Sequence, residues 1–254
     1  MLTLDLTDRV AVVTGATGQL GRAMAKTLAQ CGADIAVHYH HNRQKAEELC
    51  EAIRGLHRKA APFSCDVGDL QSVMDMHKEI VKKLGAPDIV VCNAVVQYQW
   101  TTVLGQDIGD YESQFRSCVL QAVHFAKAFV PGMAEKGKGR FIAINTECAM
   151  QCLPTQSAYA AGKRGMDGVL RVLAKEVGSQ GITVNEVAPG WTISERDREN
   201  GTKTDEAYSR SVPLRRRGTD QEIANTVAFL ASDLASNITG AYIPVCGGNV
   251  MPCI

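Results

Sequence analysis

RVAVVTGATGQLG, residues 9–21, is the stretch that decides the fold. Its first five residues are apolar and largely β-branched after the leading arginine, which predicts a buried strand. Residues 14–21 then form a glycine-rich turn, and an apolar helical pattern begins at Leu20. Strand, glycine turn and helix in this order are typical of a dinucleotide site, because glycines let a pyrophosphate approach the backbone and the helix N-terminus provides free N–H groups. A glycine-rich turn without a ligand is the alternative.

Strands and helices alternate along the rest of the chain without a linker or a break in composition. Repeated strand–helix units predict an α/β fold, namely a Rossmann-type, doubly wound parallel sheet of about seven strands in a single domain over residues 1–254. Such sheets bind ligands at the carboxyl ends of their strands. After the first strand, the expected strands are 35–39, 60–64, 88–92, 140–145, 182–187 and 241–245, and the main helices after the first are 43–56, 70–84, 111–135, 157–177 and 221–231.

Tyr159 and Lys163 lie four residues apart in a predicted helix, so they share one helix face. An ammonium beside a phenol favours the phenolate and lowers a pKa that is ordinarily about 10. A tyrosine tuned in this way can exchange a proton with an alcohol or a carbonyl. The pair alone is weak evidence, since a surface tyrosine beside a lysine is common. In a chain that also has a dinucleotide turn, it indicates catalysis.

Composition excludes several other classes of function. The chain has 254 residues, with 27 basic and 27 acidic side chains, so it lacks the basic excess of a nucleic-acid-binding protein. No apolar run is long enough for a membrane helix. The nine cysteines are scattered and odd in number, which favours a reducing compartment, and we expect a cytoplasmic enzyme. Three clustered histidines lack a recognised ligand spacing, so no metal site is expected.

Further motifs follow the later strands: Asp66-Val67, Asn93-Ala94 and Pro189-Gly190. Together with the glycine turn and the Tyr159/Lys163 pair, they resemble the short-chain dehydrogenase/reductases in their single-domain form. The resemblance covers nearly the whole chain and implies a nicotinamide cofactor and hydride transfer between an alcohol and a carbonyl. By the resemblance, Tyr159 exchanges the proton, Lys163 lowers its pKa and binds the nicotinamide ribose, and Thr146 stands where the family usually has serine. The cofactor-binding positions implied are Gly15, Thr17, Gly18, Gln19, Leu20, Gly21, Asp66, Val67, Asn93, Ala94, Tyr159, Lys163, Pro189, Gly190 and Thr192.

Four positions depart from the family pattern. Gln19 replaces a glycine, Val95 replaces another, and Thr146 replaces serine. Cys118 stands where the family usually has an asparagine that relays protons through water. These departures keep a second hypothesis open, in which the chain binds the cofactor with little or no catalysis and acts as a sensor or an assembly subunit.

Cofactor choice depends on the residues after the second strand. An acid there selects NAD, whereas basic residues accept the 2′-phosphate of NADP. The chain has no acid at this place, and His40 and Arg43 could pair with a phosphate. The sequence therefore favours NADP over NAD.

The substrate is expected to be a small carbonyl or alcohol compound, and 3-oxoacyl reductase-like is the nearest family label. Residues 191–217 are polar and predict a lid over the substrate. Helices 111–135 and 157–177 carry apolar residues beyond one face, including Phe115, Phe125 and Phe129, which together with the family resemblance predicts a homotetramer or homodimer. The expected substrate-binding residues are Tyr98, Trp100, Glu147, Gln151 and Trp191.

Overall fold

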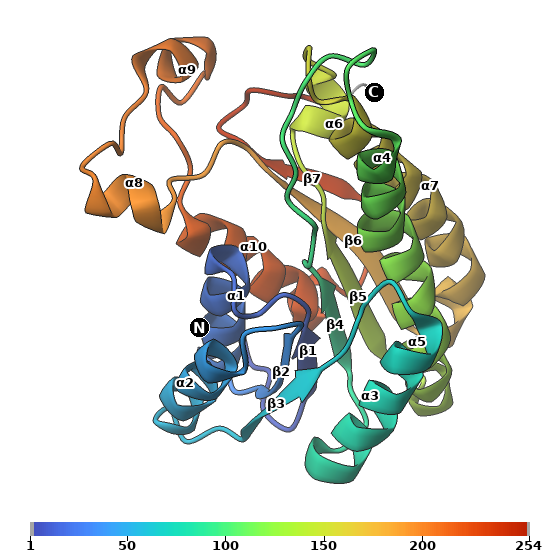
Figure 1. Cartoon of the computed structure of the whole chain (residues 1–254). Coiled ribbons are helices and arrows are strands. Elements are labelled where there is room, and N and C mark those ends of the chain that lie inside the picture. Colours follow the sequence, from blue (N-terminus) through green and yellow to red (C-terminus); the bar gives the residue numbers. More distant parts are fainter. Residues whose placement is uncertain (1–2, 253–254) are drawn as a thin grey trace.

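The protein forms one seven-stranded parallel sheet with helices on both faces, as the computed structural model of residues 3–252 shows (Figure 1). The strand order is β3-β2-β1-β4-β5-β6-β7, and every neighbouring pair is parallel. The predicted α/β class, strand number and parallel arrangement are confirmed. The strands are β1 (Val10–Val13), β2 (Asp34–Tyr39), β3 (Ala60–Ser64), β4 (Ile89–Cys92), β5 (Gly139–Ile144), β6 (Ile182–Pro189) and β7 (Tyr242–Val245).

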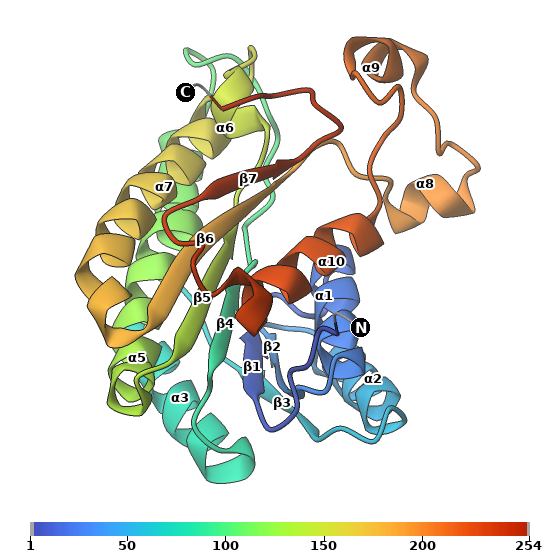
Figure 2. The ribbon, with the colours of Figure 1, turned by 180° about the vertical axis from the view of Figure 1, so that it is seen from behind.

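The helices form two layers that bury the two faces of the sheet (Figures 1 and 2). Central strands are apolar on both faces because each face packs on a helix layer, as β1 shows with all four residues buried. One layer consists of α1 (Gln19–Gln30), α2 (Arg43–Arg54) and α10 (Asp220–Ala231), and the other of α3 (Leu70–Leu84), α4 (Ile108–Gln114), α5 (Gln121–Lys136) and α7 (Ser157–Val177).

The predicted helix over residues 111–135 is interrupted. A π-helical turn, Phe115–Leu120, separates α4 from α5, and Cys118 lies within it. Phe125 and Phe129 stack in the core with ring centroids 5.3 Å apart, so the expectation that they lie outside the packed face is wrong, whereas Phe115 is exposed. Single π turns inside α-helices frequently occur at functional sites.

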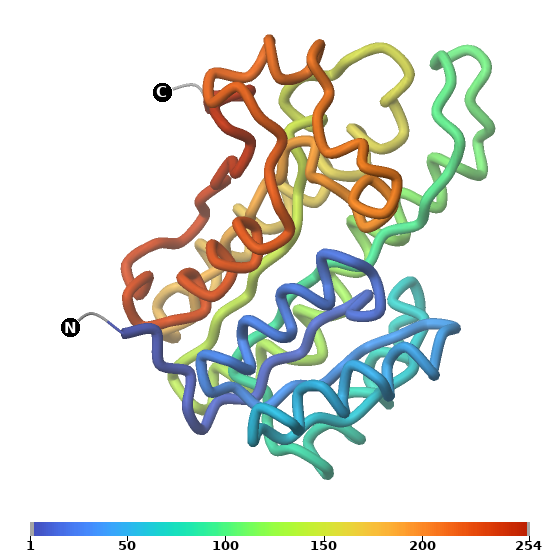
Figure 3. The backbone as a smooth tube through the Cα atoms, turned by 90° about the vertical axis from the view of Figure 1, so that its left-hand side faces the viewer, coloured from blue at the N-terminus to red at the C-terminus, as the bar shows by residue number. Residues whose placement is uncertain are grey.

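Three short α-helices were not predicted from the sequence. They are α6 (Cys148–Gln151), directly after β5, and α8 (Glu195–Glu199) and α9 (Glu206–Ser211), between β6 and α10. Figure 3 shows the segment between β6 and α10 passing over the same end of the sheet as the loops after β4 and β5. The strand order reverses between β1 and β4, which is where open α/β sheets bind ligands.

No helix in the described part of the chain is both long and apolar enough to cross a membrane. Within residues 3–252, no group of three or more histidine, cysteine or acidic side chains is arranged to hold a metal ion.

Candidate active site

The glycine turn between β1 and α1 is built for close approach of a ligand. Gly15 has a φ of +59°, and a Cβ at Gly21 would lie 2.3 Å from the Gly15 carbonyl oxygen. No side chain caps the N-terminus of α1, and its first turn carries no acidic residue. Unpaired N–H groups and the positive end of the helix dipole attract an anion. The turn therefore fits the pyrophosphate of a dinucleotide.

A cavity of about 740 Å³ lies against this turn and extends across the ends of β2, β3 and β4. Its lining contains His40 but not Arg43, whose exposed side chain pairs with Glu47 at 3.7 Å. The structure therefore does not bring Arg43 to this cavity. The predicted cofactor residues that line it are Gly15, Thr17, Gly18, Gln19, Leu20, Gly21, His40, Asp66, Val67, Asn93 and Ala94.

Hydrogen bonds fix the wall of this cavity. The Thr14 hydroxyl accepts from the backbone N–H groups of Asn93 and Ala94, at 2.7 and 2.8 Å. His38 on β2 accepts from the Gly15 N–H at 2.9 Å, and its other ring nitrogen lies 3.1 Å from the Cys65 carbonyl. Burial lowers the pKa of His38 to about 4, so its ring is neutral at pH 7 and joins the turn to the neighbouring strands. No sequence pattern marked His38 for this role.

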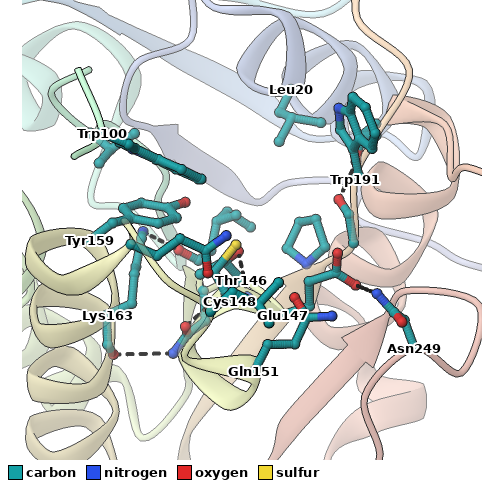
Figure 4. Close-up of a pocket in the computed structure, with 18 of the residues that line it drawn as sticks. Leu20, Trp100, Thr146, Glu147, Cys148, Gln151, Tyr159, Lys163, Trp191 and Asn249 are labelled. Atoms are coloured by element: carbon teal, nitrogen blue, oxygen red, sulfur yellow. Dashed lines mark hydrogen bonds between the residues drawn. The ribbon is translucent and has the colours of Figure 1, made fainter. Parts of the chain in front are cut away.

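Tyr159 and Lys163 lie on α7, one turn apart, facing the end of β5 (Figure 4). The Lys163 ammonium lies 5.9 Å from the centroid of the Tyr159 ring and donates a hydrogen bond to the Ile144 carbonyl at 2.5 Å. Trp100 stacks on the Tyr159 ring with centroids 5.8 Å apart. The Tyr98 hydroxyl accepts from the Tyr159 N–H at 2.7 Å, which anchors the start of the helix.

The pKa of Tyr159 differs in direction from the expected one. Burial raises the pKa of the phenol, and this effect outweighs the lowering by Lys163 and by a hydrogen bond with the Thr146 side chain. For Lys163, burial acts to lower the pKa, but the nearby Cys118, Tyr159 and Glu186 raise it above its usual value. Lys163 therefore stays an ammonium, while Tyr159 stays a protonated phenol that can donate to a carbonyl oxygen.

Asn145 connects the catalytic helix to the sheet. Its amide donates to the Glu186 carboxylate and, at 3.3 Å, to the Lys163 carbonyl, and its oxygen accepts from the Thr146 N–H at 2.8 Å. One side chain thereby fixes the backbone of two catalytic positions. Cys118 is fully buried nearby, with its sulfur 4.0 Å from Gln114 Oε1.

A second cavity of about 590 Å³ opens beside Tyr159. It shares Leu20, Asn93, Val95, Val96 and Gln97 with the first cavity, so the two form a continuous cleft. The predicted residues that line this part are Tyr98, Trp100, Thr146, Glu147, Gln151, Tyr159, Lys163, Pro189, Gly190, Trp191 and Thr192. Lining residues that the sequence had not singled out are Val96, Ile144, Asn145, Cys148, Leu153, Gln156, Tyr208, Ser211 and Asn249. Tyr208 and Ser211 lie within the predicted lid.

Glu147 joins three distant segments at this cavity, and Figure 4 shows its contact with Asn249. Its carboxylate accepts from the Tyr208 hydroxyl at 3.0 Å and from the Asn249 amide at 3.0 Å. Burial raises the pKa of Glu147, while its hydrogen bonds oppose the shift. Tyr208 can approach because residue 190 is glycine: a Cβ there would lie 2.7 Å from the Tyr208 hydroxyl.

Gln19, at the position where glycine was expected, binds the segment after β6. Its amide donates to the Ile193 carbonyl at 2.7 Å and to Asp220 at 3.2 Å, and its oxygen accepts from the Glu195 N–H at 2.9 Å. Arg22 pairs with Glu195 beside it. The departure from the glycine pattern therefore ties the cofactor turn to the segment over the cleft.

Comparisons with known proteins agree with this geometry. The sequence profile of a family described as enoyl-(acyl carrier protein) reductase matches residues 15–249. A 3-oxoacyl-[acyl-carrier-protein] reductase FabG from Pseudomonas aeruginosa is 36% identical over 248 residues, covering 98% of this chain and 100% of the relative. The chain belongs to the short-chain dehydrogenase/reductase family. It is accordingly an oxidoreductase that uses a nicotinamide cofactor, and the hypothesis of a non-catalytic subunit is not favoured.

Solved structures of similar enzymes share the fold. A gluconate 5-dehydrogenase from Burkholderia cenocepacia in complex with NADP and tartrate superposes with a TM-score of 0.89 at 26% identity, covering 97% of this chain and 96% of the other. A 7α-hydroxysteroid dehydrogenase complexed with NADH and a 7-oxo bile acid gives 0.88 at 27% identity, covering 98% and 97%. These dehydrogenases differ in both cofactor and substrate.

Proposed function

We propose that this dehydrogenase/reductase reduces a ketone, or oxidises the corresponding secondary alcohol, with Tyr159 as the proton donor or acceptor. The observation that carries the proposal is the continuous cleft: Tyr159, Lys163 and Thr146 line the part that adjoins the cofactor cavity. A nicotinamide cofactor bound there supplies or accepts the hydride. The protein's own residues hold the carbonyl oxygen and transfer the proton.

Each catalytic residue has a separate task. The Tyr159 phenol donates its proton to the oxygen of the reacting carbonyl, while the Thr146 hydroxyl orients that oxygen. Lys163 holds a positive charge next to the phenol, which stabilises the phenolate that remains after proton transfer. Positioning of Thr146 and Lys163 depends on Asn145, which contacts the backbone of both.

NADP is the preferred cofactor in this proposal. The lining residues after β2 are His40, His41 and Asn42, so no carboxylate is available there to accept hydrogen bonds from a ribose 2′-hydroxyl. Arg116 adds a permanent positive charge to the same cavity. The wild-type protein should bind NADPH more tightly than NADH in a fluorescence titration, and the reverse order would refute the preference.

Residues 191–217 are proposed to act as a lid. Trp191 and Tyr208 from this segment line the substrate cavity, and the Arg217 guanidinium lies 4.3 Å from the Trp191 ring centroid. Closure of such a segment excludes water and positions the substrate.

A homotetramer is proposed for the assembly, because an apolar hollow lies open between α5 and α7.

The direct test is a cofactor oxidation assay with a panel of carbonyl compounds. Two substrate classes are suggested by relatives: a 3-oxoacyl thioester and a polyhydroxylated acid. The panel should hold both, with simple ketones, diketones and a reaction without ketone as the control. Ketone-dependent oxidation of NADPH supports the proposal. If no compound of any class increases the rate of oxidation above the control, the proposed activity is wrong.

A further inference from the structure

Both tryptophans of the chain line the substrate cavity. Trp100 belongs to the loop after β4, and Trp191 to the segment after β6. Figure 4 shows Trp100 over the Tyr159 ring and Trp191 across the pocket from it. Tryptophan is on average a highly buried residue, yet these two are 42% and 47% exposed. Two half-exposed indoles in one cavity indicate a contact surface for a ligand.

The loop that carries Trp100 is held on both sides of this residue. The buried Gln106 amide donates to the Gln99 carbonyl at 3.1 Å, and its oxygen accepts from the Thr101 N–H at 3.0 Å. The indole itself stacks on the Tyr159 ring. Its position relative to the catalytic phenol is therefore fixed before a substrate binds, which lowers the entropic cost of binding.

Trp191 is held by contacts within the proposed lid. Its backbone N–H donates to the Tyr208 hydroxyl at 2.9 Å, and the two rings meet at 84° with centroids 5.4 Å apart. The Arg217 guanidinium lies 4.3 Å from the indole centroid and donates to the Asp197 carboxylate at 2.7 Å. The second indole is thus also placed by the protein's own contacts.

The charges near the two indoles disfavour a cationic ligand. The face of an aromatic ring attracts cations, but Arg217 already occupies such a position at Trp191. Lys163 lies beside Tyr159, on whose ring Trp100 stacks. A second cation at either place would be repelled by the first. The rings are therefore suited to an uncharged partner.

Two buried polar side chains of the cavity offer little to a ligand. Glu147 accepts from the Tyr208 hydroxyl and from the Asn249 amide. The Gln156 side-chain oxygen has almost no accessible surface, so it is sealed from the open cavity. A ligand gains more from the open aromatic surface, and a flat ring covers that surface with less loss of rotamer freedom than a flexible alkyl chain.

We propose that Trp100 and Trp191 form an aromatic platform, which selects a carbonyl or alcohol substrate that carries an uncharged aromatic ring. The inference rests on the proposed function and names the substrate class for the same cleft. An aromatic pair strengthens binding by a factor of about 2–12 beyond the effect of the area that it buries. Discrimination between an aromatic ring and a saturated ring of similar size is therefore the quantity to measure.

The experiment compares 4-phenylbutan-2-one with 4-cyclohexylbutan-2-one, with NADPH as the hydride donor. Each ring is separated from its carbonyl by methylene groups, so the two ketones have similar intrinsic reactivity. For the wild type, kcat/KM should be about tenfold higher for the phenyl ketone. Trp100→Leu and Trp191→Leu should each reduce this ratio about threefold. Trp100→Phe and Trp191→Phe are the matched controls, because they keep a ring at each position, and they should retain most of the ratio.

Several results would overturn the platform. Equal or higher kcat/KM of the wild type for the cyclohexyl ketone would indicate a plain apolar pocket. A preference for a 3-oxohexanoyl thioester, or for a ketone with a trimethylammonium group, over the phenyl ketone would also overturn it. So would an unchanged ratio in both leucine variants, with melting temperatures that show them to be folded.

The proposed function fails separately, through the absence of hydride transfer with every ketone. The platform is then tested by binding alone, because the chain has only these two tryptophans. Trp191→Phe leaves Trp100 as the only indole, and Trp100→Phe leaves Trp191. Saturable quenching of indole fluorescence by 4-(4-nitrophenyl)butan-2-one in both variants, with or without NADP⁺, supports the platform. Quenching in one variant only, or in neither, overturns it.

Discussion

Glu186 is a buried carboxyl group beneath the catalytic helix. It lies on β6, and it is 2% exposed. Burial raises its pKa to about 8, and a hydrogen bond with Asp167 on α7 acts in the same direction, while the Asn145 amide opposes it. At neutral pH the folded protein therefore holds a proton on this group that the unfolded chain releases.

This proton makes stability depend on pH in a defined direction. Between about pH 4.5 and 8 the folded state binds more protons than the unfolded state, so the free energy of unfolding falls as pH rises. Glu186→Gln mimics the protonated form and should raise the melting temperature at pH 8 by several degrees, with little change at pH 5. The exposed Glu79→Gln is the control and should show no such difference. An equal shift at both pH values would contradict the assignment.

Individual residues also show which parts of the candidate site could be predicted from the sequence. Gly21, Asn93 and Tyr159 were predicted to line the cleft, because glycine turns, strand ends and helix faces follow from local patterns. Arg43 lies outside the lining, because the direction of a long side chain at the start of α2 depends on its neighbour Glu47. The pKa direction of Tyr159 was wrong, because burial is a property of the folded chain.

At the scale of elements, the cofactor turn and the proposed lid are coupled through Gln19. Its side chain makes three hydrogen bonds to the lid segment and to α10. Since such bonds contribute about 0.5–1.5 kcal/mol each, loss of the two that reach the lid segment, with Ile193 and Glu195, should favour an open lid by roughly 1–3 kcal/mol. Opening the lid exposes the cleft that it covers.

Gln19→Gly and Gln19→Ala should therefore accelerate cofactor release. We expect the dissociation rate of NADPH, measured by stopped-flow fluorescence, to increase about tenfold in both variants. The pair separates two causes, because glycine also loosens the backbone and alanine does not. If only the glycine variant releases the cofactor faster, backbone flexibility and not the lid contact is responsible.

Element boundaries were predictable where local patterns control them. The predicted ranges 60–64 and 70–84 match β3 and α3. The π turn Phe115–Leu120, which packs against α7, was missed because it leaves no change in apolar periodicity. Helices α8 and α9, in the proposed lid, were missed although the capping residues Ser194 and Asp205 precede them. Both helices are polar, so they show no apolar periodicity.

On the scale of the whole molecule, an apolar hollow between α5 and α7 is left uncovered by any other segment of residues 3–252. The hollow between α5 and α7 is lined by Val123, Val130, Val169 and Leu173, and Val172 beside them is 56% exposed. Exposed apolar patches of this kind mark contact surfaces. A self-complementary contact here produces a two-fold dimer, and a second one produces a tetramer.

The assembly is tested by mass in solution. Light scattering should give about 110 kDa, four times the chain mass of 27.4 kDa. Val172→Asp should reduce this mass, because it places a charge in the contact. Val81→Asp is the matched control, since Val81 is an exposed valine on α3, away from the hollow, and its variant should keep the wild-type mass. A wild-type monomer at micromolar concentration would contradict the assembly.

The central claim is that Tyr159 transfers the proton beside a bound nicotinamide cofactor. Its most direct test is Tyr159→Phe, which removes the hydroxyl and keeps the ring that stacks on Trp100. The measurement combines turnover on a ketone substrate with the dissociation constant of NADPH. We predict a fall in kcat of about 10²–10⁴-fold, with cofactor affinity and melting temperature close to those of the wild type. Wild-type turnover by the folded variant would contradict the account.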